Sequence, residues 1–299
     1  MEVKLSLHDY IDKMLSEFGM EDCKLEPTPA SATIDLTPLD HIHDDNENTS
    51  VSDRESRTCD FGRPSDYRSL VGKLLFAANT VRYDISHIVG VLSRYLQAPK
   101  EIHWKAAKRV LRYLHGTKDF GIKYRHIPGS TVEGYSDADW GSDTSTRKST
   151  TGLIFRYAGG PITWKSKKQA TVAQSSSEAE YVALSESCKE ALWLINLLGE
   201  FNVNVKGLVI HEYNKGAIDM ANHPTQHHKS KHIDFKVHFI RDHTSKGEIK
   251  VQYLRTEEQL ADMLTKNLPR NQFERLRDLC ENKEFLASGN SLPSAQGVC

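Results

Sequence analysis

The chain has 299 residues, of which 38% are hydrophobic and 26% are charged, and its formal net charge is -1. These values are typical of a chain that folds around a sizeable core and forms one or two domains. A net charge near zero excludes a generally basic surface, so nucleic acid would have to be held by local basic patches. No stretch approaches the roughly 18 consecutive apolar residues of a membrane helix, so we expect no membrane partner.

The five cysteines are odd in number, widely scattered and never spaced as a Cys-x-x-Cys pair. This pattern argues against both a disulfide framework and a zinc finger. It favours a reducing environment, and we therefore expect an intracellular, cytoplasmic protein.

Two segments of different character come first. Residues 8–19 carry apolar side chains at helical spacing and predict a short helix within residues 1–25. The following residues are rich in Pro, Ser, Thr and Asp and offer little apolar surface to offset the entropy of ordering. We therefore predict a disordered linker over residues 26–66.

Residues 67–128 return to a helical pattern, and one helix is expected near residues 102–117. Trp104, Ala107, Leu111 and Leu114 form its apolar stripe. The basic residues on another stripe of this helix are Lys105, Lys108, Arg109 and Arg112. The stripe fits either a solvated helix face or a surface that contacts phosphates, and the sequence leaves both interpretations open.

After Pro128 the periodicity changes to that of strands and longer helices. Strands are predicted over 132–140, 151–157 and 161–166, followed by a long helix over 175–199 and a strand over 207–211. Helices near 215–222 and 231–242, a strand over 248–254 and a last helix over 256–266 complete the order. The order β-β-β-α-β-α-α-β-α predicts an α/β domain over residues 129–269, and residues 270–299 read as a mobile tail.

Three acidic residues in this domain are candidates for chemistry. Asp137 falls at the end of the first strand, where an acid also fits simple turn formation. Glu180 continues the apolar face of the long helix towards its start, although Ser177 and Glu180 also match a capping box. Ser175 and Glu178 match that capping pattern too. Asp262 lies in the last predicted helix and alone would be an ordinary surface acid.

The predicted topology brings these three acids together. A three-stranded meander followed by αβα places the first strand end, the start of the long helix and the last helix near one end of the sheet. Clustered carboxylates repel one another and require cations. Two Mg²⁺ or Mn²⁺ ions about 3.5–4 Å apart would satisfy them and support phosphodiester hydrolysis.

Residues 223–243 hold six histidines with lysines between them. His228 and His232 stand one helical turn apart, but no convincing third ligand for zinc follows. Contact with nucleic-acid phosphates or with a hybrid duplex fits this stretch better than a zinc site does. An ordinary solvated helix also fits it better. The candidate contact residues are Lys229, Lys231 and His232.

Ordered sequence blocks reveal a resemblance. The segments GYSDADW, STTGLIF, ITWKSKKQ, SSSEAEYVAL, KHIDFKVHFIRD and QLADMLTK resemble the ribonuclease H blocks of copia-type (Ty1/copia) retrotransposon Pol polyproteins. The earlier YRSLVGKLLFAANTVRYDISHIVGVLSRYLQAP and HWKAAKRVLRYLHGT look like the segment that links the family's reverse transcriptase to its ribonuclease H. The likeness covers nearly the whole chain apart from the linker and the tail.

The resemblance implies a fold and a function. The fold would be ribonuclease H-like, with a mixed five-stranded sheet flanked by helices and a helical segment before it, residues 1–25 being a reverse-transcriptase remnant. The activity would be metal-dependent hydrolysis of RNA in RNA/DNA hybrids, without a small-molecule substrate. The remainder of a Pol polyprotein would be the protein partner, inside a virus-like particle if the element is intact. The chain lacks a Tyr-x-Asp-Asp motif, so no polymerase activity is expected.

The resemblance also identifies a departure at the site. Asp137, Glu180 and Asp262 match three of the family's four metal-binding acids, but Tyr213 precedes Asn214 where the fourth, an Asp, is expected. The neighbouring Glu212 should point to the opposite face of its strand. We therefore expect either a ribonuclease H of impaired activity, or a non-catalytic nucleic-acid-binding remnant. A fragment without a selected role also remains open.

Overall fold

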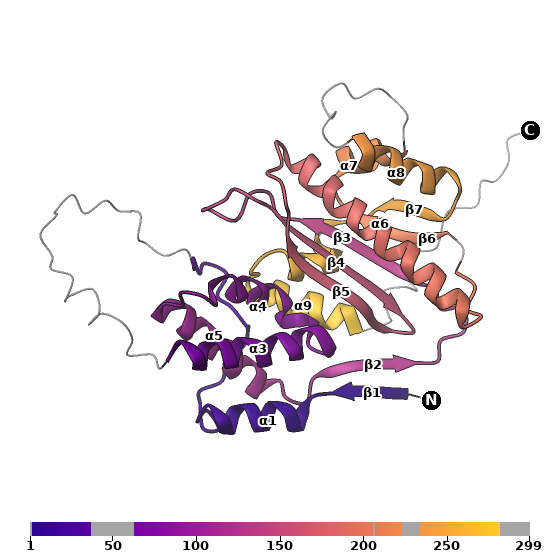
Figure 1. The fold of residues 1–299 in the computed structure, drawn as a ribbon. Helices are drawn as coiled ribbons and strands as arrows, with labels where there is room; N and C mark the ends of the chain where they lie inside the picture. Colours follow the sequence, from indigo (N-terminus) through magenta and orange to yellow (C-terminus); the bar gives the residue numbers. More distant parts are fainter. Residues whose placement is uncertain (1, 37–62, 206, 223–233, 282–299) are drawn as a thin grey trace, which may run out of the picture.

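The computed structural model describes residues 2–36, 63–205, 207–222 and 234–281, and a five-stranded mixed sheet lies at its centre (Figure 1). The strands are β3 (Glu133–Ala138), β4 (Thr150–Tyr157), β5 (Gly160–Lys168), β6 (Leu208–Glu212) and β7 (Ile249–Tyr253). Their order across the sheet is β5-β4-β3-β6-β7. Strands β3 to β5 form an antiparallel meander, whereas β6 pairs parallel to β3 and β7 parallel to β6. The expected α/β class, strand number and mixed pairing are confirmed.

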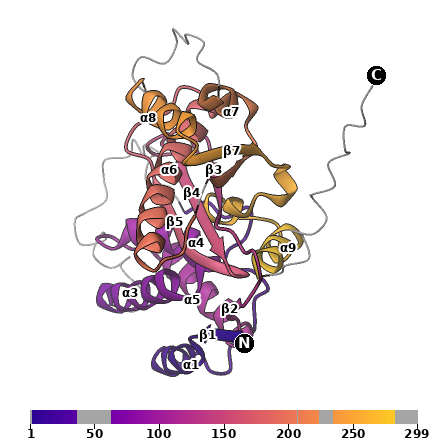
Figure 2. The same cartoon turned by 90° about the vertical axis from the view of Figure 1, so that its right-hand side faces the viewer.

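Helices cover both faces of this sheet (Figure 2). The long α6 (Ser176–Glu200) packs on one face together with α7 (Lys215–Asn222) and α8 (Asp234–Ser245). On the other face lie α9 (Arg270–Glu281) and the 3-10 helices η4 (Thr256–Glu258) and η5 (Leu260–Leu264). Among the helices of the described residues, none combines the length and the apolar character needed to cross a membrane.

The N-terminal half forms a helical layer beside the sheet. Its helices are α1 (His8–Glu17), α3 (Pro64–Thr80), α4 (Ser86–Leu92) and α5 (Glu101–Gly116), with the 3-10 turns η1 (Tyr83–Ile85) and η2 (Ser93–Tyr95). The strands β1 (Glu2–Ser6) and β2 (Gly121–Arg125) pair antiparallel. The helical pattern expected over residues 67–128 is therefore wrong at β2. A Cβ at Gly121 would lie only 2.1 Å from the Leu5 carbonyl oxygen, so glycine permits the close approach of β1.

The helical layer and the sheet share one hydrophobic core. Buried Leu74 of α3 and Leu111 of α5 belong to the same cluster as Tyr135 and Ile154 of the sheet and Leu264 of η5. The two halves therefore stabilise each other, although the sequence pattern separates them into a connection segment and a ribonuclease H-like domain.

The predicted linker is only partly tested. Residues 37–62 lie outside the described residues, but residues 26–36 run along the helical layer, where Ala30 and Leu36 are buried. The Leu36 carbonyl oxygen lies 2.9 Å from Nε2 of the buried His103. Disorder is therefore wrong for residues 26–36, because a few apolar side chains and backbone contacts fix a stretch whose composition is polar. At the far end, α3 begins at Pro64, a residue well suited to a first helical turn.

The mobile tail was predicted to begin at residue 270, which is too early in the chain. Residues 270–281 form α9, and its buried Phe273, Leu276 and Cys280 occupy one face at spacings of three and four residues. This short amphipathic stripe is enough to dock the helix on the core. The expected tail over 270–299 is therefore wrong for its first part, and residues 282–299 lie outside the described residues.

The last predicted helix, 256–266, is also replaced by different structure. Gln259 adopts an extended conformation between the two 3-10 turns η4 and η5. Its side-chain amide donates hydrogen bonds to the backbone oxygens of Ser136, at 2.9 Å, and His211, at 3.4 Å. These tertiary contacts tie the chain to β3 and β6, and they explain why the local helical pattern does not produce an α-helix.

Candidate active site

Asp137 is fully buried near the end of β3, on the sheet face that meets η5. It pairs in register with Gly152 of β4, where a Cβ would lie 2.6 Å from Thr265 Cγ2 and 2.8 Å from the Ala261 carbonyl oxygen. The missing side chain at Gly152 therefore lets η5 approach the sheet. As a result, the Thr265 hydroxyl donates a hydrogen bond to Asp137 Oδ2.

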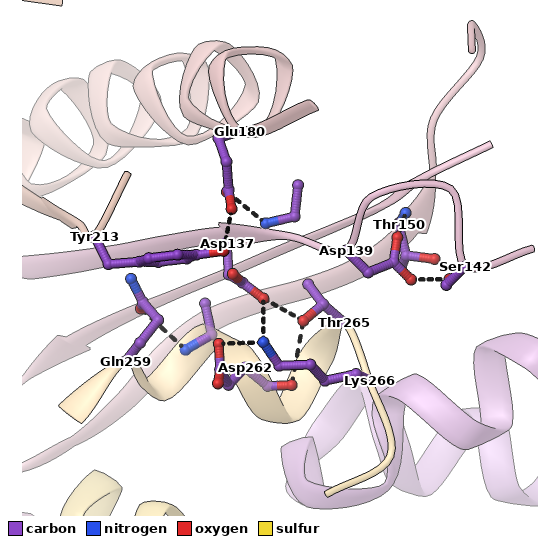
Figure 3. A network of polar contacts seen from close by, with 12 residues as sticks. Asp137, Asp139, Ser142, Thr150, Glu180, Tyr213, Gln259, Asp262, Thr265 and Lys266 are labelled. Atoms are coloured by element: carbon purple, nitrogen blue, oxygen red, sulfur yellow. Dashed lines mark hydrogen bonds and ion pairs between the residues drawn. The ribbon is translucent and has the colours of Figure 1, made fainter. Parts of the chain in front are cut away.

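Glu180 reaches the same end of the sheet from the first turns of α6 (Figure 3). It is 1% exposed, and its Oε2 accepts a hydrogen bond of 2.7 Å from the backbone amide of Ala138. Capping of α6 falls instead to Ser175, whose hydroxyl accepts from the Glu178 amide at 3.2 Å. The Glu178 carboxylate accepts from the Gln174 amide at 2.9 Å, so that capping box is formed only on the Ser175 side. These contacts assign Glu180 to the site and not to the helix cap.

Tyr213 follows β6 and faces the cluster. Its hydroxyl donates a hydrogen bond to Glu180 Oε1, as the dashed line in Figure 3 shows. The carboxylate of Glu212, one residue earlier, is completely buried and accepts 2.9 Å hydrogen bonds from the amides of Tyr213 and Asn214. Asn214 in turn accepts from the Ala217 amide at 3.1 Å and so caps the start of α7. Glu212 therefore lies close enough to Glu180 for its charge to act on that carboxylate.

Asp262 lies in η5, opposite the end of β3, and is fully buried. Lys266, one turn further along, places its Nζ atom 3.0 Å from Asp262 Oδ1 and 3.8 Å from Asp137 Oδ2. Figure 3 shows this ammonium group between the two carboxylates. The structure thus brings Asp137, Glu180 and Asp262 together, with Tyr213 at one side and Lys266 at the other.

The four buried carboxylates Asp137, Glu180, Glu212 and Asp262 are called the acid cluster below. Burial raises the pKa of Glu180 well above its usual range, and the negative charges of Glu212 and Asp137 raise it further. Burial likewise raises the pKa of Glu212, and burial with the charge of Asp137 raises the pKa of Asp262 to about 7. The cluster is therefore electrostatically costly and favours any group that supplies positive charge or donates a hydrogen bond.

Two neighbours meet this need. Burial and the charges of Glu180 and Asp137 raise the pKa of the Tyr213 hydroxyl, which keeps it a hydrogen-bond donor. Burial alone would lower the pKa of Lys266, but Asp137 and Asp262 outweigh it, so its pKa is raised and the ammonium form is retained. Each expected metal-binding acid thus already has a partner from the protein.

The donor chemistry suits a hard cation, but the arrangement does not. Carboxylate oxygens are the ligands that Mg²⁺ and Mn²⁺ prefer, and Asp137 Oδ1 is buried without a hydrogen-bond partner in the described part of the chain. Yet within residues 2–36, 63–205, 207–222 and 234–281 no three His, Cys, Asp or Glu side chains converge on a position that could hold a metal ion. Tyr213 and Lys266 take up oxygens that such an ion would require. The residues as placed therefore do not fit a two-metal site.

The predicted basic stripe of α5 is largely occupied. Arg109 forms an ion pair of 2.9 Å with Glu26, and the exposed Lys105 pairs with Glu101 at 2.5 Å. Lys108 lies over the ring of Trp104, 5.1 Å from its centroid.

The segment over residues 23–28 also passes Arg112, whose backbone oxygen accepts from the Glu26 amide at 3.5 Å. Arg109 and Arg112 are therefore partly covered and do not belong to one open basic surface. Lys229, Lys231 and His232 lie outside the described residues.

Three contributors to the site were not predicted from the sequence. Thr265 and Lys266 stand three and four residues after Asp262, a spacing that could have signalled a shared face. Gln259, which anchors η5, gave no comparable signal, and Glu212 was expected to point away from the site. Asp139 follows directly after the end of β3 at Ala138, and its carboxylate accepts hydrogen bonds from the Ser142 hydroxyl and the Thr150 amide.

Comparison with known proteins agrees with this architecture. The sheet order, the flanking helices and the acids at one end of the sheet define a ribonuclease H-like domain. No family model matches the chain. The chain is 38% identical over 277 residues to the retrovirus-related Pol polyprotein from transposon TNT 1-94 of Nicotiana tabacum, an alignment that covers 92% of this chain and 20% of that protein. It is 42% identical over 212 residues to the Pol polyprotein from transposon RE2 of Arabidopsis thaliana, covering 71% of this chain and 14% of that protein.

The chain belongs to the copia-type retrotransposon Pol polyprotein family. It spans a fifth or less of the length of these two relatives. Among solved structures, LC11-RNase H1, isolated from compost by a metagenomic approach, aligns with 48% of this chain and 96% of its own, at 14% identity and a TM-score of 0.36.

Proposed function

We propose that this chain is a ribonuclease H-like module of a copia-type Pol polyprotein that binds RNA/DNA hybrids but cleaves their RNA strand only weakly. The observation that supports impaired cleavage most directly is the hydrogen bond from the Tyr213 hydroxyl to Glu180 Oε1. In the family pattern this position holds a carboxylate that binds a metal ion. In this chain it holds a hydroxyl group that donates a hydrogen bond.

The chemical consequence is twofold. A phenol that stays protonated cannot replace an acceptor-only carboxylate as a metal ligand. The same phenol also engages Glu180 Oε1, while Ala138 engages Oε2, so Glu180 has both oxygens occupied. A divalent cation at this site would therefore lack one ligand, because Tyr213 does not supply a carboxylate. It would also compete with the Tyr213 hydroxyl for a second ligand, Glu180.

Hybrid binding has a different physical origin and should survive. Affinity for a nucleic-acid duplex comes mainly from phosphate contacts, and recognition of the RNA strand comes from its 2′-hydroxyl groups. The loop between β3 and β4 begins just after the strand end that carries Asp137, and it bears the exposed Trp140 and Arg147. We propose that these side chains contact sugar and phosphate without any metal ion. Because the chain belongs to the Pol polyprotein family, we also propose the rest of a Pol polyprotein as a partner.

The test is cleavage of an end-labelled RNA/DNA hybrid in Mg²⁺ and in Mn²⁺. Tyr213→Asp restores the missing carboxylate and should raise the cleavage rate by about 10–100-fold, the usual scale for groups that support a metal site. Tyr213→Phe is the matched control, because it frees Glu180 without adding a ligand, and it should give a much smaller gain. Adding Asp137→Asn to Tyr213→Asp should abolish the gain. No gain for Tyr213→Asp would refute the proposal that Tyr213 is the main cause of impairment.

A further inference from the structure

Lys266 occupies a central place in the acid cluster. It extends from the turn after η5 and puts its ammonium group 3.0 Å from Asp262 Oδ1 and 3.8 Å from Asp137 Oδ2. Both carboxylates are almost completely buried, whereas the lysine side chain is 38% exposed at its solvent side. The ammonium group therefore meets acids that water does not reach.

This contact differs from an ion pair between two exposed side chains. Lys118, for example, is 34% exposed and lies 3.2 Å from Asp12, but that aspartate is itself 44% exposed. Water solvates an exposed carboxylate when its partner is removed, whereas buried Asp137 and Asp262 would be left without compensation. Lys266 thus has an electrostatic role that a surface lysine does not have.

We propose that Lys266 is a built-in cation of the acid cluster, which neutralises Asp137 and Asp262 and competes with divalent metal ions for their oxygens. A divalent ion binding these two carboxylates has to displace the ammonium group, and the four-carbon stem, open on its solvent side, gives Lys266 room to move away. Lys266 is a positioning residue in this account, since it acts through the two aspartates. The inference concerns the same cluster as the proposed function but does not depend on cleavage.

The test measures metal binding directly, with Mn²⁺ as the probe and the full chain as the protein. Electron paramagnetic resonance of free Mn²⁺ gives the affinity of the wild type, of Lys266→Met and of the control Lys118→Met. We expect Lys266→Met to bind Mn²⁺ at least about 10-fold more tightly than the wild type, and Lys118→Met to match the wild type. Lys266→Arg, which keeps the charge, should bind no more tightly than the wild type.

Thermal unfolding supplies a second readout. In EDTA, Lys266→Met should unfold at a lower temperature than the wild type, and Mn²⁺ should raise its midpoint more than that of the wild type. If Lys266→Met aggregates in EDTA, refolding with Mn²⁺ becomes the measurement, and recovery of folded protein supports the proposal.

An unchanged or weaker Mn²⁺ affinity in Lys266→Met, or no recovery with Mn²⁺, overturns the inference. These outcomes are separate from those of Tyr213→Asp. The Tyr213 test reads hybrid cleavage with Lys266 in place, and the Lys266 test reads metal affinity with Tyr213 in place.

Discussion

A buried ion pair in the helical layer allows a quantitative test of the shared core. Arg82 and Asp84 are both fully buried, and the guanidinium group donates two hydrogen bonds to the carboxylate, at 2.9 and 2.7 Å. Tyr113 of α5 donates a third, at 2.6 Å, and its own hydroxyl accepts from Arg277 of α9 at 3.4 Å. The network thus joins η1, α5 and α9, which lie far apart in the sequence.

Asp84→Asn keeps the shape of the side chain but removes the charge that compensates Arg82. Loss of one partner from a buried ion pair typically costs about 3–5 kcal/mol of folding free energy. We therefore expect the free energy of unfolding to fall by about that amount in urea titrations. Fluorescence is a suitable probe, because Trp164 of β5 donates to the Ala78 oxygen of α3 and so reports on the contact between sheet and helices.

The matched control is Asp12→Asn, which breaks the exposed pair with Lys118 and should cost less than about 1 kcal/mol. The reasoning is refuted if Asp84→Asn costs no more than this control. It is also refuted if tryptophan fluorescence and helical circular dichroism give two separate transitions in the wild type, because a shared core requires the layers to unfold together.

Two further predictions concern pH and packing. Burial and the charge of Arg94 lower the pKa of His87 to about 4, below the value near 6.5 of an unfolded chain, so protonation favours unfolding. The contribution of His87 to stability should therefore be complete above about pH 6.5 and fall by about 3 kcal/mol as the pH drops towards 4, and urea titrations of His87→Gln should lose this part of the pH dependence. Gly152→Ala should cost about 1–3 kcal/mol, because its Cβ would collide with Thr265 and push η5 from the sheet. Thermal unfolding should show the opposite sign for Gly199→Ala in α6, where a Cβ meets nothing within 4 Å, and equal effects would contradict the packing argument.

Much of the domain could be predicted from local pattern. Alternation identified the strands, and continuation of the apolar face of α6 identified Glu180, because side-chain direction repeats regularly along strands and helices. Alternation also placed Glu212 on the face opposite Tyr213. It could not show that Glu212 raises the pKa of Glu180, because this effect depends on how α6 packs against β6.

Other features depend on contacts between distant residues. Gln259 anchors its segment to β3 and β6, and this tertiary bonding overrides the helical pattern around Asp262. The hydroxyl of Tyr213 reaches Glu180 across 33 positions in the sequence. The family pattern predicts a carboxylate at the position of Tyr213, but only the folded chain shows that the tyrosine hydroxyl donates to another acid of the site.

Hybrid binding and hybrid cleavage are proposed to be separate properties of this chain. The most direct measurement records both on one labelled RNA/DNA hybrid, with fluorescence anisotropy for affinity and gel analysis for cleavage, in Mg²⁺ and in Mn²⁺. We expect the wild type to bind the hybrid, with an affinity that falls as salt rises, and to leave most of the RNA strand intact. Rapid cleavage by the wild type that Asp137→Asn abolishes would contradict it, as would the absence of binding.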